Sequence, residues 1–565
     1  MIKERIRELK NSFKKFNIDG YVVPKNDEFF SEFSKVDRLK KISNFSGSAG
    51  YAVILKRKNY LFVDGRYTLQ AQIESGKNFI ITDYSKILNC NLFKNLKLGI
   101  NPKLFVSNQI NKFFLKYNRI EIIEKDLINV NSEKNSYYLK PFFSLKDNVV
   151  GESYKKKINK VSTFLKKNKC NFIYITAPEN VAWLLNIRGF DNPISPIPNC
   201  HLLLDNKKGM YLITEKKKAN NLIKEKKISS KQVIDTSNFE SLIKKLDGKK
   251  IMIDSKTCSI FYENILRKKF QILKIEDPIY YFKAIKNKVE IKNMINAHIL
   301  DGLALTKFLY WIKKINQKKI TEFEAQNKLE EFRKKNSNYL YPSFNTIAGT
   351  GSNGAIIHYR ATKKKTKHIK KDDIFLCDSG GQYKYGTTDV TRTICFNKPK
   401  KKIKDIFTRV LKGHIAVASV DLNKLNTGKK IDTKARKFLK KINLDYKHGT
   451  GHGVGFFSNV HEGPQSISSS NNIKIREGMI LSNEPGYYKK GKFGIRIENL
   501  VYVKKEKNKL YFKNLTLAPI DNDLIDPKQL TYYEKNYLFN YNLKIYSKLS
   551  KFLNKNERKW LLASF

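Results

Sequence analysis

Residues 448–455 read His-Gly-Thr-Gly-His-Gly-Val-Gly, and His461-Glu462-Gly463-Pro464 follows shortly after. The chain has only eight histidines, and three of them fall within these fourteen residues. A single histidine is usually a satisfied core residue, but glycines on both sides allow backbone and ligand to approach closely. The stretch therefore predicts a functional site in the C-terminal half of the chain.

Two aspartates lie in or beside apolar strands upstream of these histidines. Residues 374–377 predict a buried strand that Asp378 follows directly, and the alternation over residues 387–393 predicts a second strand that contains Asp389. The segment 380–386 provides a turn, so we expect a hairpin that brings the two aspartates together. Because a buried carboxylate is costly unless a cation lies beside it, this pair indicates a cation site.

Two glutamates complete an acidic set. Glu484 follows the apolar residues 479–481, and Glu498 lies in the predicted strand 494–499, on the same face as Arg496. A surface ion pair usually explains one such residue, but two Asp, two Glu and at least one His together indicate metal ligands. Oxygen-rich ligation with one imidazole suits divalent ions such as Mn²⁺, and four carboxylates neutralise two of them. Arg496 is expected to orient the carboxylates.

The composition bounds the rest of the molecule. At ~150 residues per domain, a chain of 565 residues is expected to form three or four folding units. Its 41% hydrophobic and 12% aromatic content excludes wholesale disorder. Lys plus Arg number 110 against 52 Asp plus Glu, a formal charge of +58 that attracts polyanions. The lysines are spread from end to end, however, so we expect no specific nucleic-acid partner.

Cysteine usage and the N-terminus indicate the compartment. The six cysteines are Cys90, Cys170, Cys200, Cys258, Cys377 and Cys395. Their spacing argues against a disulfide framework or a zinc ribbon and for reduced thiols. Residues 1–7 lack the apolar run of a signal peptide, and no segment reaches the ~20 apolar residues that span a bilayer. We therefore expect a soluble, cytoplasmic protein with no membrane partner.

The order of the predicted strands and helices indicates how the chain divides into domains. Strands at residues 20–23, 51–55 and 59–63 open an α/β domain, and a similar rhythm restarts near residue 145, as in a diverged duplicate. A long helix from Val289 opens a third domain, and residues 321–324 (Thr-Glu-Phe-Glu) predict a capping box before another helix. The expected divisions are an N-terminal α/β domain (1–147), a middle α/β domain (148–280), a catalytic domain (281–510) and a C-terminal helical extension (511–565).

Several short strings carry a resemblance to a known family. They are residues 46–50 (SGSAG), 64–67 (DGRY), 183–189 (WLLNIRG), 378–380 (DSG), 386–393 (GTTDVTRT), 448–455 (HGTGHGVG), 460–464 (VHEGP) and 483–488 (NEPGYY). As a set they resemble the pita-bread metallopeptidases, and within these the three-domain Xaa-Pro aminopeptidases (aminopeptidase P). The resemblance implies an α/β (α+β) fold, with two N-terminal creatinase-like α/β domains followed by a C-terminal pita-bread catalytic domain.

The same resemblance assigns the metal ligands. They fall on Asp378, Asp389, His452, Glu484 and Glu498. Two Mn²⁺ ions per subunit are implied, with Co²⁺ or Zn²⁺ as alternatives. Asp389 and Glu498 would bridge the ions, His452 and Glu484 would complete one, and Asp378 would hold the other. A metal-bridging hydroxide would attack the Xaa-Pro carbonyl and release the N-terminal residue from peptides with proline second.

The resemblance also assigns substrate contacts. His358 matches a catalytic residue that contacts the substrate and polarises its carbonyl, and His461 matches one that hydrogen-bonds the substrate and shuttles protons. His448 matches a wall of the proline pocket. Arg66 matches a substrate-binding arginine, with an ion pair to Asp64 as its alternative role.

Other functions stay open at this point. A prolidase, which acts only on Xaa-Pro dipeptides, would share every metal ligand, although the length and the tail favour the aminopeptidase. Methionine aminopeptidases lack this long N-terminal half, and creatinase-like relatives have lost the metal ligands. The alternative from another class is a non-catalytic protein that binds nucleic acid or acidic partners through its charge, which the intact ligand set disfavours. The family implies a homodimer.

Overall fold

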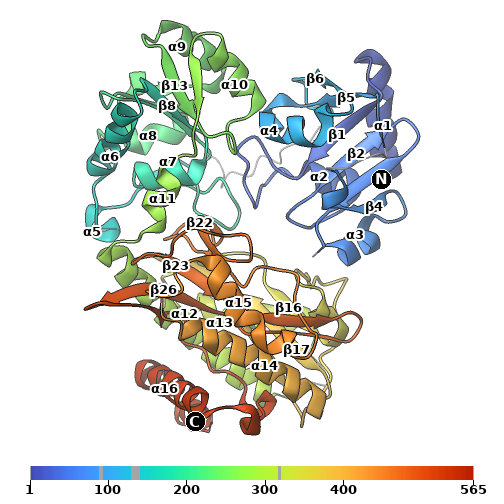
Figure 1. The fold of residues 1–565 in the computed structure, drawn as a ribbon, viewed down its shortest axis with the longest axis vertical. Helices are drawn as coiled ribbons and strands as arrows, with labels where there is room; N and C mark the ends of the chain where they lie inside the picture. Colours follow the sequence, from blue (N-terminus) through green and yellow to red (C-terminus); the bar gives the residue numbers. More distant parts are fainter. Residues whose placement is uncertain (1, 66, 88–92, 129–139, 316–319, 564–565) are drawn as a thin grey trace. The chain divides into compact units, whose positions relative to one another are not determined.

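The computed structural model describes residues 2–65, 67–87, 93–128, 140–315 and 320–563. Contacts divide the chain into two compact units, Met1–Tyr280 (unit 1) and Tyr281–Phe565 (unit 2). Helices and strands are mixed in both units, as Figure 1 shows. This mixture confirms the predicted α/β class. The finer four-part division of the chain stays a prediction.

The described residues of unit 1 contain two six-stranded sheets. The first has the order β4 (Ile80–Asp83), β3 (Asn59–Val63), β2 (Tyr51–Leu55), β1 (Gly20–Pro24), β5 (Lys97–Ile100) and β6 (Arg119–Ile122). The second has the order β12 (Val233–Ile234), β11 (Met210–Ile213), β10 (His201–Asp205), β8 (Phe172–Ile175), β13 (Lys250–Ile253) and β14 (Gln271–Lys274). Taken in chain order, both sheets place the fourth, third, second, first, fifth and sixth strands side by side.

The strand directions of the two sheets also agree. β1 is antiparallel to β2 and parallel to β5, just as β8 is antiparallel to β10 and parallel to β13. This common topology is what the repeated rhythm near residue 145 predicts for a diverged duplicate. The helices of unit 1 are α1 (Ile2–Lys15), α2 (Arg38–Ser43), α3 (Thr68–Ser75), α4 (Ser107–Ile110), α5 (Asp147–Val150), α6 (Tyr154–Lys167), α7 (Pro178–Leu184), α8 (Asn220–Lys224), α9 (Phe239–Lys245) and α10 (Ile260–Arg267).

Two helices in the first part of unit 2 begin with capping boxes. α11 (Ile279–Ala284) leads into α12 (Lys288–Lys314), which is the predicted long helix. Asn287 and Glu290 form a capping box at the start of α12. The predicted box at Thr321 is present as well, with Glu324 as its partner, and it begins α13 (Glu322–Lys334). Apolar residues of α12, including Leu305 and Phe308, pack with α13 and the central strands.

The strands in the described residues of unit 2 form four small sheets. They are β15 (Tyr339–Pro342), β18 (Gly381–Tyr383) and β19 (Gly386–Thr387) in one; β16 (Ile347–Thr350), β17 (Ile374–Ser379) and β20 (Val390–Cys395) in another; β22 (Glu462–Ile467), β21 (Gly451–Gly453), β23 (Ile480–Asn483), β26 (Asn499–Glu506) and β27 (Lys509–Asn514) in the third; and β24 (Gly486–Lys489) and β25 (Phe493–Arg496) in the fourth. Helices α14 (Lys401–Ala418) and α15 (Gly428–Lys440) pack against each other and help to bury these strands.

The C-terminal extension is helical, as predicted. It contains α16 (Tyr532–Leu549) and α17 (Lys555–Leu562), and a Thr531–Glu534 capping box begins α16. Tyr541, Ile545 and Leu549 of α16 join the core that α14 helps to form. The extension is therefore packed into unit 2 and is not a loose tail.

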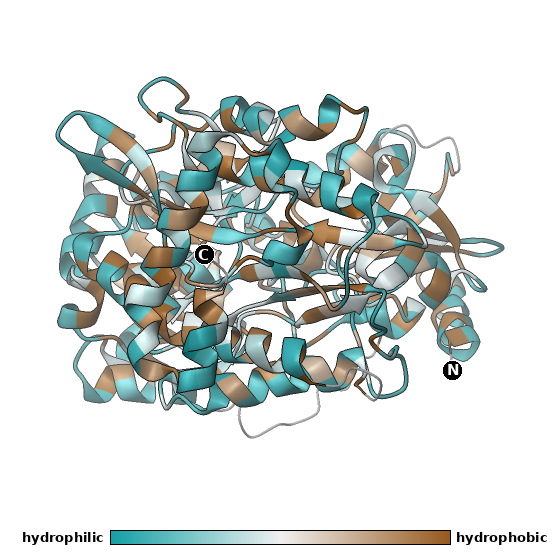
Figure 2. Cartoon of the chain, turned by 90° about the horizontal axis from the view of Figure 1, so that it is seen from below, coloured by the Kyte–Doolittle hydropathy of each residue, from teal (hydrophilic) through white to brown (hydrophobic). Residues whose placement is uncertain are grey.

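Hydrophilic and hydrophobic residues alternate along the helices, as the teal and brown segments of Figure 2 show. Among the described residues, no helix is both long enough and apolar enough to cross a membrane. Five of the cysteines fall in the described part of the chain, and all five are buried free thiols. Cys90 lies outside it.

Candidate metal centre

Asp378 lies near the end of β17, and Asp389 directly precedes the neighbouring strand β20. β17 pairs antiparallel with β20, and Asp378 stands opposite Thr391, two residues beyond Asp389. This register brings the two aspartates close enough for the charge of Asp389 to raise the pKa of Asp378. Both side chains are buried.

The predicted strand over residues 387–393 is wrong in its extent. β19 ends at Thr387 and β20 begins at Val390, so Asp389 lies in a break between them. The expected turn contains β18, which pairs with β19 in a separate sheet. Gly380 permits this arrangement because a Cβ there would lie 2.0 Å from the carbonyl oxygen of Thr388. Such close packing of distant backbone segments leaves no signal in local alternation.

His452 lies in the middle of β21 and is held by its own backbone. The Ser482 hydroxyl accepts a hydrogen bond from the His452 amide over 2.9 Å. Nδ1 lies 2.9 Å from the carbonyl oxygen of Gly453, which can only accept, so Nδ1 is the donor. The other ring nitrogen, Nε2, faces the carboxylates of Asp389 and Glu484 at 3.3 and 3.7 Å. A hydrogen bond of this kind fixes the ring orientation of a metal-binding histidine.

Glu484 and Glu498 each follow the end of a strand. Glu484 comes directly after β23, and its amide donates to the Thr450 carbonyl over 2.8 Å. The predicted strand 494–499 is wrong in its extent, because β25 ends at Arg496 and β26 begins after Glu498. The cause is again tertiary, since the Glu498 amide donates to the Thr391 carbonyl over 3.2 Å. The Thr391 hydroxyl also donates to Oε2 of Glu498 over 2.8 Å.

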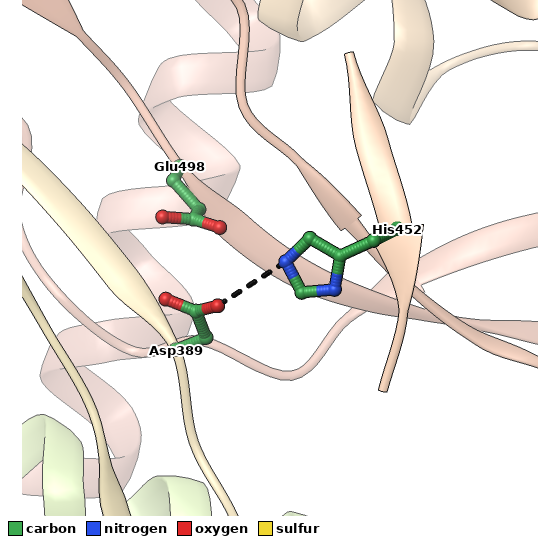
Figure 3. A group of neighbouring side chains, drawn as sticks. All are labelled: Asp389, His452 and Glu498. Atoms are coloured by element: carbon green, nitrogen blue, oxygen red, sulfur yellow. Dashed lines mark ion pairs between the residues drawn. The ribbon is translucent and has the colours of Figure 1, made fainter. Parts of the chain in front are cut away.

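Three of the expected ligands converge closely. Asp389, His452 and Glu498 each offer one ligand atom, and these atoms all lie within 4.8 Å of one another. Figure 3 shows the two carboxylates on one side and the imidazole edge pointing between them. Glu484 adjoins the group through His452, and Asp378 adjoins it from the paired strand. The structure thus brings all five side chains to one region of unit 2.

The buried oxygens of this region fit a cation. In the part of the chain that the structure describes, Oδ1 of Asp378 and Oδ1 of Asp389 are buried and accept no hydrogen bond. Buried acceptors normally have a partner, and each exception calls for an explanation such as an ion. With oxygens from four carboxylates and one imidazole nitrogen, the donor set suits Mn²⁺ and similar divalent ions.

The electrostatics of the region favour positive charge. Burial, together with the charges of Asp389 and Glu484, raises the pKa of Asp378 to about 7 against the opposing effect of Arg496. Burial and the neighbouring carboxylates also raise the pKa of Glu498 well above its ordinary value. Burial would lower the pKa of His452, but the hydrogen bond to Asp389 and the charge of Glu484 raise it to about 9. The site therefore holds protons tightly, and a metal ion has to displace them.

Arg496 contacts the carboxylate of one predicted ligand, and its role in orienting the ligands stays a prediction. Its Nη2 lies 2.5 Å from Oδ2 of Asp378, and both groups are buried. Its Nε donates to the Thr391 hydroxyl over 3.0 Å, and Nη1 donates to the Tyr488 hydroxyl over 2.6 Å. One planar guanidinium therefore fixes three groups around the site.

His448 is connected to Arg496 through Tyr488. Nδ1 of His448 lies 2.7 Å from the carbonyl oxygen of Gly449, and Nε2 lies 2.9 Å from the Tyr488 hydroxyl. Burial lowers the pKa of His448 to about 4, so its ring is neutral near pH 7. Nδ1 therefore carries the proton, and Nε2 accepts from Tyr488. Thr391 and Tyr488 lie within the quoted strings, but no local pattern names the distant partners that would assign them a role.

The remaining predicted residues are placed less closely. His461 is exposed and stands edge-on to His452, with ring centroids 4.3 Å apart. His358 is half-buried and follows the short helix η9 (Gly351–Ala355), directly before buried Tyr359. Arg66 lies outside the described residues. The roles of these three side chains stay predictions.

A second acidic group in unit 2 is already neutralised. Ligand atoms of Cys395, Asp521 and Asp523 also lie within 4.8 Å of one another. Nζ of Lys313 lies 2.8 Å from Asp521 and 2.9 Å from Asp523. The ammonium occupies the position that a cation would need, so this group is an ion-pair network.

Comparisons with known proteins agree with this geometry. Three family profiles match the chain: metallopeptidase family M24 over residues 292–505, the creatinase/prolidase N-terminal domain over 133–290, and the C-terminal region of peptidase M24 over 508–564. A protein of Coprinopsis cinerea named "Probable Xaa-Pro aminopeptidase P" is 36% identical, with 99% of this chain and 97% of that protein covered. The chain belongs to metallopeptidase family M24.

Solved structures of this family match to different extents. The X-prolyl aminopeptidase of Caenorhabditis elegans superposes with a TM-score of 0.91 at 28% identity, over 100% of this chain and 99% of its own. It is described as a cytosolic enzyme with a di-nuclear active site. A prolidase of Thermococcus sibiricus covers 65% of this chain and 98% of its own, with a TM-score of 0.54 and 27% identity. The predicted arrangement of creatinase-like and pita-bread domains is thereby confirmed.

Proposed function

We propose that this family M24 member is an Xaa-Pro aminopeptidase, which removes the N-terminal residue from peptides with proline in the second position. The observation that carries the proposal is the convergence of Asp389, His452 and Glu498, with Glu484 and Asp378 beside them. The full-length similarity to proteins named as aminopeptidases supports this activity over the prolidase alternative, because the prolidase covers only 65% of the chain.

The five predicted ligands would hold two divalent ions. Such ions supply Lewis acidity, which activates water and polarises a carbonyl oxygen near neutral pH. Arg496 and Thr391 keep Asp378 and Glu498 in place for this task. We assign Mn²⁺ as the ion because the donors are four carboxylates and a single imidazole. Metal analysis of the purified protein, followed by reloading of the metal-free protein with Mn²⁺, Co²⁺ or Zn²⁺, tests this assignment.

Proton transfer falls to histidines at the site. Hydrolysis breaks the bond between the acyl carbon and the proline nitrogen, so water supplies a hydroxyl to the carbon and the nitrogen gains a proton. His461 is exposed beside His452 and is suited to deliver that proton. His358 would hydrogen-bond the carbonyl oxygen. The neutral, half-buried ring of His448 would form a wall for proline.

Recognition of proline follows from its chemistry. A proline imide has no N–H, and its ring fixes the backbone dihedral angle. A peptidase that relies on that donor loses a contact at this position. A site that holds the ring in a pocket and the carbonyl at a metal pair recognises the same feature. Arg66 would add a contact to the substrate.

Peptide hydrolysis tests the proposal. The Mn²⁺-loaded protein is expected to cleave an Xaa-Pro-Pro tripeptide after its first residue, whereas a prolidase would cleave only the Xaa-Pro dipeptide. Asp389→Ala should abolish turnover and reduce metal uptake. Asp372→Ala, at an exposed aspartate before β17, is the matched control and should retain both. Normal turnover by Asp389→Ala would overturn the assignment of this ligand.

Assembly and location form a separate part of the proposal. We expect a homodimer, because α16 exposes the large side chains Tyr532, Tyr533, Phe539 and Leu543. Sedimentation velocity of the wild type against a Phe539→Ser/Leu543→Ser variant tests this interface. The cytosolic description of the Caenorhabditis elegans enzyme supports a cytoplasmic location, which cell fractionation tests. A salt-dependent DNA shift assay tests whether the charge of +58 binds nucleic acid.

A further inference from the structure

Arg392 is a fully buried arginine beside the metal centre. Its side chain is among the largest that are almost inaccessible to solvent, with 2% exposed. A guanidinium has five N–H donors in a fixed planar arrangement, and a buried donor without an acceptor is costly. Every donor of Arg392 has an acceptor. They are the carbonyl oxygens of Thr391, Glu498, Ala518 and Pro519, Oδ1 of Asn499 and the hydroxyl of Tyr541.

These acceptors carry no formal charge. Among the described residues, no carboxylate forms an ion pair with Arg392, in contrast to the buried pairs of Arg333 with Asp301 and of Arg496 with Asp378. An isolated buried charge destabilises a fold, and an apolar residue of similar volume is often better tolerated. The guanidinium is therefore best explained by the geometry of its hydrogen bonds.

The acceptors come from two different parts of unit 2. Nη1 lies 2.7 Å from the carbonyl oxygens of both Thr391 and Glu498, in the segments that carry the metal centre. Nε lies 3.0 Å from the carbonyl oxygen of Pro519, and Nη2 lies 2.9 Å from the hydroxyl of Tyr541 in α16. One rigid group thus joins the C-terminal extension to the backbone of a predicted ligand.

Glu498 is held at several points by hydrogen bonds with Arg392 and Thr391. Its carbonyl oxygen accepts from Arg392, and its amide donates to the Thr391 carbonyl. Its carboxylate accepts from the Thr391 hydroxyl over 2.8 Å. Since Arg392 also holds the Thr391 carbonyl, a displaced guanidinium would shift both ends of Glu498.

Tyr541 of α16 contacts Arg392 from the side of the C-terminal extension. Its hydroxyl donates to the Ala518 carbonyl over 2.8 Å and accepts from Nη2 of Arg392. The ring is buried in the core that α16 shares with α14. Removal of the hydroxyl would leave the guanidinium with one fixed acceptor fewer on the side of the extension.

We infer that Arg392 is a positioning residue for the metal ligand Glu498, and that Tyr541 of the C-terminal extension sets its orientation. The extension is then part of the architecture that shapes the metal site. This inference rests on the proposed function for its kinetic readout, but metal affinity reports on it independently. Partners of this kind typically change metal affinity or activity by about 10–100-fold.

Tyr541→Phe tests the inference with little disturbance of the core. We expect Mn²⁺ affinity of the metal-free protein, measured by titration calorimetry, to weaken by about tenfold. We expect kcat on an Xaa-Pro-Pro tripeptide to fall by about the same factor, with KM within about twofold, because the substrate contacts are untouched. Arg392→Lys keeps the charge but not the planar array of donors, and it should weaken Mn²⁺ binding further.

Tyr537→Phe is the matched control. This tyrosine lies one turn earlier in α16, and its ring is stacked on that of Tyr541 with centroids 6.5 Å apart. Its hydroxyl accepts from Asn514 and is not among the hydrogen-bond acceptors of Arg392 in the described residues. It should match Tyr541→Phe in thermal stability but retain Mn²⁺ affinity and kcat within about twofold. Equal Mn²⁺ affinity of the Tyr541→Phe and Tyr537→Phe variants would overturn the inference. An inactive wild type that still binds Mn²⁺ would overturn only the proposed function.

Discussion

Nη2 of Arg496 lies 2.5 Å from Oδ2 of Asp378, and the two residues are separated by 118 positions in the sequence. The contact leaves the other oxygen, Oδ1, buried and without a hydrogen-bond partner among the described residues. Arg496 therefore holds the carboxylate through Oδ2 and leaves Oδ1 available to a cation. A metal site built this way depends on the shape of the guanidinium as well as on its charge.

Arg496→Lys separates shape from charge. An ammonium cannot hold Asp378, Thr391 and Tyr488 in the same planar arrangement, so we expect metal content to fall and kcat to drop by about 10–100-fold. Metal analysis and steady-state kinetics measure the two effects. Arg409→Lys is the control, because Arg409 forms a partly exposed pair with Asp405 on α14 and should tolerate the change. Retention of full activity and metal content by Arg496→Lys would contradict this role.

Tyr488→Phe tests the connection between Arg496 and His448. The substitution leaves Nη1 of Arg496 and Nε2 of His448 without their hydrogen-bond partner. An unsatisfied buried group costs about 1–3 kcal/mol, so kcat/KM should fall by about tenfold or more. If His448 forms a wall of the proline pocket, much of the loss should appear in KM. Tyr487→Phe, at the adjacent tyrosine packed on Phe493, should change little.

Local sequence signals predicted the elements that depend on neighbours in the chain. The strands at 51–55 and 59–63 are present with the predicted bounds, because alternation of apolar residues is a short-range property. The capping box of Thr321 and Glu324 is present for the same reason. The breaks at Asp389 and Glu498 were missed, since tertiary contacts such as that of Glu498 with Thr391 end these strands.

The candidate site divides in a similar way. Strand ends and glycine-flanked histidines indicated the side chains that could bind metal, and the structure brings these side chains together. The residues that orient them escaped prediction, because partnerships such as Arg392 with Tyr541 join positions 149 residues apart. No local periodicity records which distant hydroxyl or carbonyl an arginine will reach.

A buried charge cluster lies next to the site on β22. Glu462, the neighbour of His461, pairs with both Lys283 and Lys286, and all three side chains are buried. Burial lowers the pKa of Lys286, and the charge of Glu462 opposes that effect. The cluster holds two cations and one anion, so its members are not equivalent.

Removal of the Glu462 carboxylate should lower the free energy of unfolding more than removal of the Lys286 ammonium. Lys286→Met leaves a balanced pair of Lys283 and Glu462, whereas Glu462→Gln removes the carboxylate that both buried lysines contact. Breaking a buried pair costs about 3–5 kcal/mol, and we expect Glu462→Gln to approach that loss and Lys286→Met to stay well below it. Chemical denaturation of the two variants measures the difference. An equal loss for both variants would show that charge balance does not govern the cluster.

The thermal stability of the Glu462→Gln variant should increase with pH. A lysine whose pKa is lowered in the folded state is less readily protonated there than in the unfolded chain, where its pKa is about 10.4. Stability then rises with pH between the folded and the unfolded pKa. We expect the melting temperature of Glu462→Gln, relative to wild type, to increase between pH 7 and pH 9. A constant difference over this range would show that loss of the Glu462 charge does not change the protonation of Lys286.

Asp277 in unit 1 should affect stability in the opposite direction to Lys286, because its contribution to stability falls as the pH rises. Burial raises its pKa to about 7, although its oxygens accept from Asn180 and from the amide of Ile279. An unfolded aspartate has a pKa of about 3.9, so between these values the folded state keeps a proton that the unfolded chain loses. The stabilising effect is fully present below pH 3.9 and is lost as the pH rises to about 7. This difference between the folded and unfolded pKa values corresponds to at most about 4 kcal/mol in the free energy of unfolding.

Asp277→Asn removes this titration while keeping the shape. The amide of Asn180 can turn to offer its Oδ1, which is buried without a hydrogen-bond partner among the described residues. We expect the variant to gain thermal stability relative to wild type as the pH rises from 5 to 8, as measured by scanning calorimetry. Asp247→Asn, at an exposed aspartate of the same unit, should show no such trend. A relative stability of Asp277→Asn that stays constant with pH would mean that Asp277 is ionised throughout this range.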